Sequence, residues 1–186
     1  MPQSLSKVYT HITFSTKNRQ NLIDTEIEQR LFNYLGGICK GLDCFPVQIG
    51  GFKNHIHILC TLARGTTQSI LLEKLKKESS KWIKTVDTKY HNFYWQHGYG
   101  IFSVNPSEIN IVEEYILKQA EHHKTKTFEE EFRAFLKKYK VVYDERYVWD
   151  WLQLFQSDDW MNVYTQGVTL CYCLSTVGAT YLTVGF

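Results

Sequence analysis

Several features of common protein classes are missing from the 186-residue sequence. Its five cysteines form no CxxC pair, which argues against a disulfide framework and against a zinc ribbon. The one long uncharged stretch, 168–186, is rich in Thr, Ser and Gly and is therefore a poor membrane span. The first residues lack the apolar run of a signal peptide. We therefore expect reduced thiols and a cytoplasmic protein that does not cross a membrane.

Lysine and arginine are absent from residues 151–186, so all 21 basic residues lie in residues 1–150. The C-terminal stretch is instead β-prone and rich in threonine. This change in composition predicts a domain at 1–150 followed by a C-terminal extension at 151–186. The mildly basic domain is compatible with nucleic acid but does not require it.

Hydrophobic periodicity predicts a regular order of strands and helices along the domain. Strands are expected at 8–14, 45–50 and 55–62, and a broken strand within 93–104, with Gly50-Gly51 as a turn or bulge after the second. Helices are expected at 24–40, 66–84, 107–123 and 128–139. This order is that of the split βαβ, ferredoxin-like fold. We therefore expect an α+β domain with one antiparallel sheet, helices packed on one face, and additional C-terminal helices.

Two histidines flank one apolar residue in the third predicted strand, in the sequence His55-Ile56-His57. Residues i and i+2 of a strand point to the same face, so the two imidazoles lie side by side. That arrangement suits two ligands of one divalent ion. Two ordinary surface histidines give the same pattern, so the motif alone does not establish a metal site.

A tyrosine and a glutamine lie four residues apart in the third predicted helix, as Tyr115 and Gln119. Residues at this spacing share one face of a helix. A lone helical tyrosine is more often an amphipathic packing residue with its hydroxyl in water. The spacing therefore becomes informative only together with the histidine strand.

Together, these motifs resemble the single-tyrosine HUH transposases of bacterial insertion sequences, which include the insertion sequence 200-like group and the related transposases that process repetitive extragenic palindromes. His55-Ile56-His57 is similar to the family's His–apolar–His motif, and Tyr115 with Gln119 to its downstream Tyr-x-x-x-Gln motif. The stretches 9–19, 51–54 and 95–104 and the pair His122-His123 are also similar to the family. The resemblance covers about residues 5–149.

The resemblance implies a metal-dependent tyrosine transposase that cleaves and rejoins single-stranded DNA with hairpins near the element's ends. Tyr115 would be the nucleophile and would form a 5′-phosphotyrosine, while His55, His57 and Gln119 would bind Mg²⁺ or Mn²⁺. It also implies an obligate homodimer, in which each site combines one subunit's histidines with the other subunit's tyrosine helix. The protein would then act at the bacterial nucleoid.

A second hypothesis is a catalytically inactive or domesticated protein of the same fold that only binds DNA hairpins. The complete set of motifs argues against this reading, whereas the unusual C-terminal extension favours it.

Candidate DNA contacts surround the predicted site. Lys17, Arg19 and Lys53 lie on loops next to strand ends, where they can bind phosphates. His122 can approach a phosphate or favour the end of its helix through the helix dipole. Two further groups are weaker candidates. Contact with DNA is possible for Lys74, Lys76, Lys77, Lys81 and Lys84, but a lysine-rich helix face is more often solvated surface. Base stacking is possible for Tyr94, Trp95 and Tyr99, but these side chains fit the core or a dimer interface at least as well.

Overall fold

A four-stranded antiparallel sheet with the strand order β2-β3-β1-β4 forms the centre of the protein. The computed structural model describes residues 5–149, so the predicted extension at 151–186 lies outside the described residues. The strands are β1 (Tyr9–Ser15), β2 (Pro46–Phe52), β3 (His55–Thr61) and β4 (Gly100–Val104). Strands β1 and β3 pair along their whole length, from Tyr9 opposite Thr61 to Ser15 opposite His55.

The helices occupy the predicted places in the chain order, with some changes at their ends. They are α1 (Glu28–Gly41), α2 (Gln68–Val86), α3 (Ile109–Leu117), α4 (Gln119–His122), α5 (Phe128–Lys138) and α6 (Glu145–Val148), with the 3₁₀ helices η1 (Lys17–Arg19), η2 (Thr88–Tyr90) and η3 (Pro106–Glu108). The strand and helix order confirms the predicted α+β, ferredoxin-like fold class. Within residues 5–149, no helix combines the length and apolar character that a membrane crossing requires.

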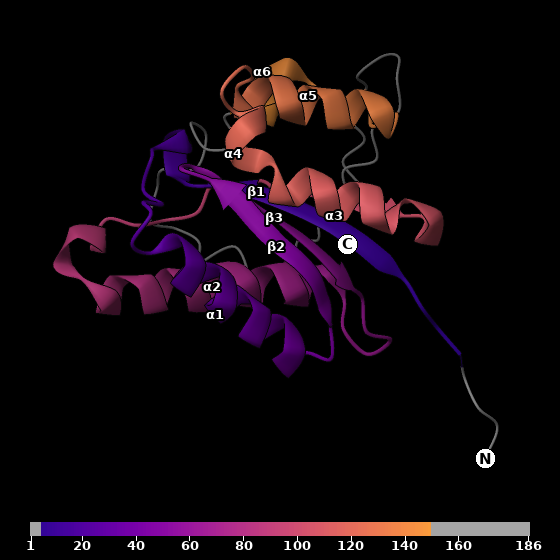
Figure 1. Cartoon of the computed structure of the whole chain (residues 1–186), viewed down its shortest axis with the longest axis horizontal. Helices are drawn as coiled ribbons and strands as arrows, with labels where there is room; N and C mark the ends of the chain where they lie inside the picture. The colour runs from indigo at the N-terminus through magenta and orange to yellow at the C-terminus, as the bar shows by residue number, and fades with distance from the viewer. Residues whose placement is uncertain (1–4, 150–186) are drawn as a thin grey trace, which may run out of the picture. The chain divides into compact units, whose positions relative to one another are not determined.

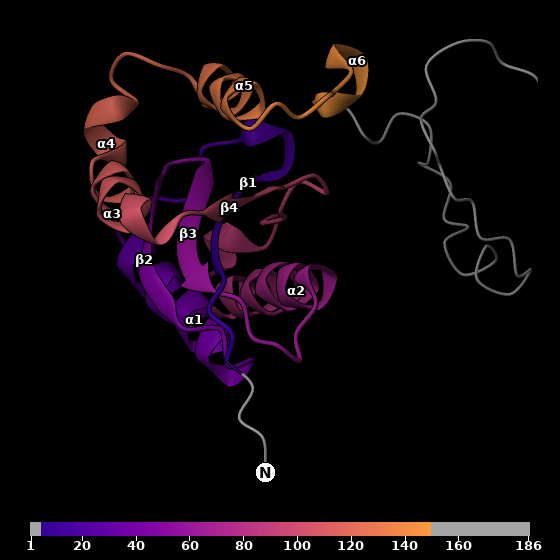
Figure 2. The same ribbon diagram turned by 90° about the vertical axis from the view of Figure 1, so that its right-hand side faces the viewer.

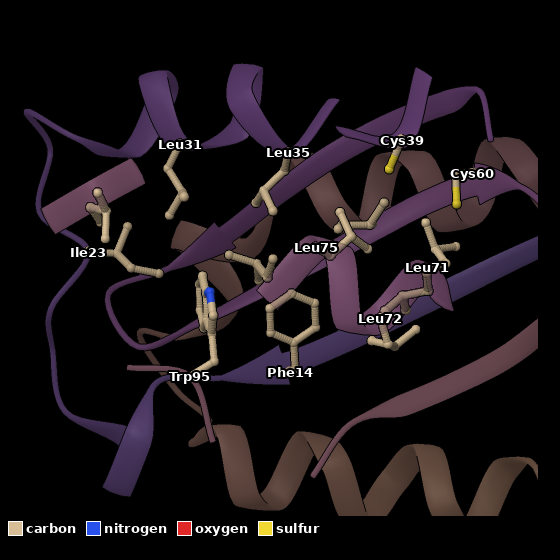
Figure 3. Close-up of a cluster of buried hydrophobic side chains, with 14 of the residues drawn as sticks. Phe14, Ile23, Leu31, Leu35, Cys39, Cys60, Leu71, Leu72, Leu75 and Trp95 are labelled. Carbon is tan, nitrogen blue, oxygen red and sulfur yellow. The ribbon is translucent and has the colours of Figure 1, made fainter. Parts of the chain in front are cut away.

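Helices α1 and α2 cover one face of the sheet, as the fold class predicts (Figure 1). The strands send alternate apolar side chains toward these helices, among them Phe14, Ile56 and Ile58. These side chains pack against Leu31 and Leu35 of α1 and the buried leucines of α2. Figure 3 shows this cluster between the helices and the strands. One hydrophobic core therefore holds α1, α2 and the sheet together.

The C-terminal helices lie over the opposite face of the sheet, where α3 and α4 run beside β2 and β3 and α5 crosses the end of the strands (Figures 1 and 2). A small cluster attaches α3 to this face through Leu59, Val104, Val112 and Ile116. A second cluster attaches α5 to β4 through Phe102, Phe128, Phe132 and Leu136. Both faces of the sheet are therefore buried, but the second face carries polar side chains as well as apolar ones.

Two local predictions were wrong. Gly50 and Gly51 lie inside β2 rather than in a turn, and the β2–β3 turn is formed by Lys53 and Asn54. A Cβ atom on Gly50 would lie 2.8 Å from the backbone oxygen of Ile116, so the glycine allows α3 to approach the sheet closely.

The helix predicted from Ser107 to about His123 is interrupted at Lys118, which has φ −92° and ψ 15°. The 3₁₀ helix η3 precedes α3 and is capped by Asn105, whose side chain accepts the Ser107 N–H. Tyr115 and Gln119 therefore belong to two successive short helices rather than to one.

Candidate metal and nucleophile site

The histidine strand presents both imidazoles to the buried second face of the sheet. His55 and His57 alternate along β3 with Ile56 and Ile58, which point into the α1–α2 core. Both histidines are fully buried, at 0% exposure. The predicted side-by-side arrangement is confirmed, whereas the reading as two surface histidines is wrong.

Two residues from the C-terminal helices meet the histidines. Gln119 at the start of α4 places Oε1 3.2 Å from Nε2 of His55. Glu131 of α5 places Oε2 3.3 Å from Nε2 of His57 and 3.7 Å from Nε2 of His55. The Gln119 Nε2–H group donates to Glu131 Oε1 at 3.1 Å, which orients both side chains. Gln119 and Glu131 are 1% and 3% exposed, so both side chains are almost entirely buried.

A third histidine reaches the same atoms. His123 places Nε2 3.0 Å from Gln119 Oε1 and 3.4 Å from Glu131 Oε2, and its side chain is 4% exposed. Its Nδ1 lies 2.8 Å from the Lys126 backbone oxygen, which can only accept, so Nδ1 carries the proton in the neutral ring. The lone pair on Nε2 therefore faces Gln119 and Glu131.

The tautomer of His55 is fixed in the same way. Its Nδ1 lies 2.8 Å from Asn54 Oδ1, and the Asn54 amide is oriented because its Nδ2 donates to the Arg19 backbone oxygen at 3.1 Å. Nδ1 therefore donates, and the lone pair on His55 Nε2 faces the oxygen atoms of Gln119 and Glu131. Nε2 of His55 and Nε2 of His123 therefore face Gln119 Oε1 and Glu131 Oε2, and all four atoms are hydrogen-bond acceptors.

Two buried atoms of this group have no hydrogen-bond partner: His57 Nε2 and Glu131 Oε2. Ligands held at about 2.1 Å from one ion lie roughly 3.0 to 3.4 Å apart when adjacent, which is close to the separations given above. His55, His57 and Glu131 have ligand atoms within 4.8 Å of one another. The group therefore fits a divalent cation, which would satisfy the unpaired atoms and the converging lone pairs.

Burial sets the protonation of the group. It lowers the pKa of both His55 and His57 to about 3, with a further contribution from the neighbouring imidazoles, so both rings are neutral and able to bind metal. Burial raises the pKa of Glu131 to about 7, an effect that His55 partly opposes. When Glu131 is ionised, its charge is unbalanced among these neutral imidazoles, and a bound cation would balance it.

Tyr115 lies beside the histidines of its own chain. Its ring meets the His57 ring edge to face, with centroids 5.8 Å apart, and the His122 ring at 5.3 Å. Tyr115 is half-buried at the edge of a cleft of about 540 Å³. The cleft is lined by Tyr115, His122, Thr125, Lys126, Glu130, Glu131, Ala134, Phe135 and Lys138. A phenol, a buried carboxylate and several basic groups therefore open onto one space.

The predicted DNA contacts differ in their exposure and in their bonding partners. Lys17 and Lys53 are exposed, and Arg19 forms an ion pair with Glu129 while its backbone oxygen anchors Asn54. The lysines of α2 differ among themselves, because Lys74 is solvated whereas Lys76 is largely enclosed and donates to three backbone oxygens.

The three aromatic candidates also differ. Trp95 belongs to the core, with Nε1 donating to Ser79 Oγ at 2.9 Å, whereas Tyr94 and Tyr99 are exposed.

The family of the chain follows from its sequence. A family model described as "Transposase IS200 like" matches residues 4–119, well over half of the chain. The chain belongs to the IS200-like transposase family. Among curated proteins, none matches the sequence.

Two solved structures share the fold with this IS200-like transposase. One is a Deinococcus radiodurans protein described as a "putative transposase", with 17% identity and a TM-score of 0.51 over 64% of this chain and 98% of its own. The other is a REP-associated tyrosine transposase bound to a REP hairpin, with 17% identity and a TM-score of 0.51 over 66% of this chain and 73% of its own. At these identities the likeness supports the fold alone.

Sequence reasoning placed His55, His57, Gln119 and Tyr115 together but missed Glu131, which lies beyond the family match. The sequence nevertheless contains one signal that points to Glu131. Glu131 occupies a position on the apolar stripe of α5, between Phe128 at i−3 and Phe135 at i+4. An acidic residue on such a stripe requires a buried partner.

Proposed function

We propose that this IS200-like transposase cleaves and rejoins single-stranded DNA with Tyr115 as its nucleophile. The observation that carries the proposal is the position of Tyr115. Its ring contacts His57, whose unpaired Nε2 faces the unpaired Oε2 of Glu131 at 3.3 Å, beside a cleft open to substrate. A phenol next to a cation site suits attack on a phosphodiester.

His55, His57 and Glu131 would hold the ion, with Gln119 and His123 adding donors from α4 and the residue that follows it. The bound ion would supply Lewis-acid polarisation of the scissile phosphate. Because three of the donors are imidazole nitrogens, the set suits Mn²⁺ better than Mg²⁺, which prefers oxygen ligands. Mg²⁺ remains the second choice to be tested.

The covalent step exchanges one phosphodiester for another. The Tyr115 oxygen attacks the phosphorus, a new P–O bond forms to the tyrosine, and the bond to the 3′-oxygen breaks. The phenolic proton passes to solvent in the cleft, and the departing 3′-oxygen takes one up to become a hydroxyl. Because the ester bond is retained on the protein, another 3′-hydroxyl can reverse the step and join the strand to a new end.

The side chains of the cleft support binding of the DNA backbone. Lys126 and Lys138 line it and can contact phosphates next to the scissile one. Lys17, Arg19 and Lys53 can extend this contact, since the Arg19 backbone is bonded to Asn54 beside His55. The REP-hairpin complex of a protein with the same fold supports a hairpin as the substrate.

One chain brings Tyr115 and the metal-binding group together, so we propose that a complete site forms within a subunit. The family resemblance implies instead a homodimer whose sites combine residues of two subunits. Both arrangements use the same residues, and mixing two site variants distinguishes them.

The test is formation of a covalent protein–DNA adduct that survives denaturation. Wild-type protein is incubated with Mn²⁺ and single-stranded oligonucleotides that carry the palindromes flanking the gene. The wild type is expected to form the adduct, and Tyr115→Phe to form none, because the phenol oxygen is the nucleophile. Tyr139→Phe serves as the matched control and should retain the adduct.

Other results would overturn the proposal. Adduct formation by Tyr115→Phe would show that another residue is the nucleophile. Hairpin binding by the wild type without any adduct, unchanged in His55→Ala and Tyr115→Phe, would instead support the inactive hairpin-binding protein.

A further inference from the structure

Another buried histidine, His11, lies behind His57. His11 of β1 places Nε2 3.0 Å from Nδ1 of His57, and both rings are closed off from solvent, at 1% and 0% exposure. The His11 ring also meets Phe135 at 5.2 Å and Tyr115 at 6.3 Å, so aromatic side chains surround it. Its Nδ1 has no hydrogen-bond partner among the described residues. His57 is therefore the one polar side chain to which His11 is hydrogen-bonded within residues 5–149.

The hydrogen bond has two forms, because a neutral imidazole carries one N–H group. In the first form, His57 donates from Nδ1 to His11, and the lone pair of His57 lies on Nε2. In the second form, His11 donates to Nδ1 of His57, and Nε2 of His57 carries the proton. Only the first form leaves Nε2 of His57 able to bind a metal ion beside Glu131.

The other histidines of the group have no such choice. His55 is bonded through Nδ1 to the Asn54 amide oxygen, and His123 to the Lys126 backbone oxygen. Both partners are oxygens that only accept, so each fixes one tautomer. Among these three histidines, only His57 has a tautomer that depends on another imidazole, that of His11.

We propose that His11 is a positioning residue that accepts the Nδ1–H of His57 and thereby holds the lone pair of Nε2 on the metal side. The inference rests on the metal site of the proposed function. Outer groups that bond to a ligating histidine fix its tautomer and orientation and raise its basicity, and their removal typically costs 10–100-fold in metal affinity. His11 would act through His57 and would not touch the DNA.

The alternative is that His11 only fills space between Phe135 and Tyr115. Two substitutions separate the roles. His11→Phe keeps an aromatic ring but removes the acceptor, whereas His11→Gln keeps an acceptor oxygen but removes the ring. Thr13→Val is the matched control, because Thr13 lies on the same face of β1 opposite His57 and has a buried hydroxyl without a partner.

The first measurement is the dissociation constant for Mn²⁺, by calorimetry on the full chain. We expect His11→Phe to weaken binding about 10- to 100-fold, His11→Gln to recover part of that loss, and Thr13→Val to bind as the wild type does. Equal binding by wild type and His11→Phe, or a larger loss in His11→Gln than in His11→Phe, would overturn the proposal.

The second measurement remains decisive if a variant is destabilised. In ¹⁵N-labelled wild-type protein loaded with Zn²⁺, the His57 Nδ1–H should give a slowly exchanging, downfield proton resonance. The resonance is expected to persist in Thr13→Val, and its absence from the wild type would contradict the role of His11. A wild type that binds no metal would overturn both this inference and the metal-dependent mechanism, whereas normal binding by His11→Phe would overturn this inference alone.

Discussion

Glu131 is the residue that the structure adds to the candidate site. It is the one carboxylate in the group of His, Cys, Asp and Glu side chains that can hold a metal ion within residues 5–149. Its Oε2 faces three imidazole nitrogens at 3.3 to 3.7 Å, and its Oε1 accepts from Gln119. A negative charge at this position would contribute strongly to the affinity for a divalent cation.

Replacing Glu131 with glutamine tests this role. Glu131→Gln keeps the size of the side chain but removes the charge, so we expect it to weaken Mn²⁺ binding at least about tenfold. Glu129→Gln, two residues earlier on α5 and partly exposed, should bind Mn²⁺ as the wild type does. Calorimetry checks both variants, and equal affinities for all three proteins would remove Glu131 from the metal site.

The residues of the site differ in how far the sequence predicted them. The alternation of β3 placed His55 and His57 on one face, because the period of a strand is fixed by its geometry. The pairing of His11 with His57 depends on the register of β1 against β3, which joins residues 46 positions apart. Periodicity within a single strand carries no information about that register.

At the scale of elements, the approach of α3 to the sheet sets the position of Tyr115. Ile116, the next residue, lies against Gly50 of β2 so closely that a Cβ atom there would be 2.8 Å from both its Cγ2 atom and its backbone oxygen. The sequence suggested a turn at this glycine pair, because glycine is common in turns. The actual reason for Gly50 is a tertiary contact, which local sequence does not reveal.

Substitution of Gly50 should therefore separate metal binding from catalysis. Gly50→Ala is expected to push α3 away from β2 and to slow adduct formation by roughly 100-fold, more than it weakens Mn²⁺ binding, because His55, His57 and Glu131 do not lie on α3. Gly37→Ala in α1 is the matched control, because a Cβ there meets nothing within 4 Å. Adduct formation by Gly50→Ala at the wild-type rate would show that α3 does not need this close approach.

A lysine of α2 holds the loop before β4. Lys76 Nζ donates to the backbone oxygens of Gln96, His97 and Gly98 at 2.9, 2.9 and 2.7 Å. The amphipathic pattern of α2 suggested that its lysines face water, but Lys76 is largely buried, and burial lowers its pKa from 10.5 to about 7. The helix pattern could not reveal this because the loop that covers Lys76 comes 20 residues later.

The lowered pKa of Lys76 predicts how its contribution to stability changes with pH. Between about pH 7 and pH 10 the unfolded chain binds the Lys76 proton more tightly than the folded protein does. The free energy of unfolding of the wild type, relative to Lys76→Met, should therefore rise with pH, by at most about 1.4 kcal/mol per pH unit. Urea unfolding of both proteins across this range checks the sign, and a falling difference would contradict it.

At the scale of the whole molecule, one face of the sheet forms the main hydrophobic core and the other carries the candidate site. Helices α1 and α2 bury the apolar face, and the C-terminal helices lie over the opposite face (Figure 2), which carries the buried side chains of His55 and His57. The order of elements predicted the ferredoxin-like sheet, because short connections leave few topologies. It did not predict the position of α5, whose Glu131 side chain completes the group.

The assembly of the site can be tested by mixing two inactive variants. Tyr115→Phe and Glu131→Gln, given different tags and expressed together, are purified as a mixed assembly by both tags. If each site forms within one chain, no adduct is expected at a Mn²⁺ concentration that saturates the wild type but not Glu131→Gln, because neither chain then has both the nucleophile and a bound ion. Restored adduct formation would show that the tyrosine of one subunit acts at the metal site of another, and a wild-type/wild-type pair with the two tags is the positive control.

The most direct test of the central claim is to identify the residue that becomes attached to DNA. The wild-type adduct is digested with protease and nuclease, and the modified peptide is sequenced by mass spectrometry. The structure predicts a nucleotide phosphate on Tyr115. A phosphate on any other residue, such as Tyr99 or Tyr139, would contradict the claim that Tyr115 is the nucleophile of this site.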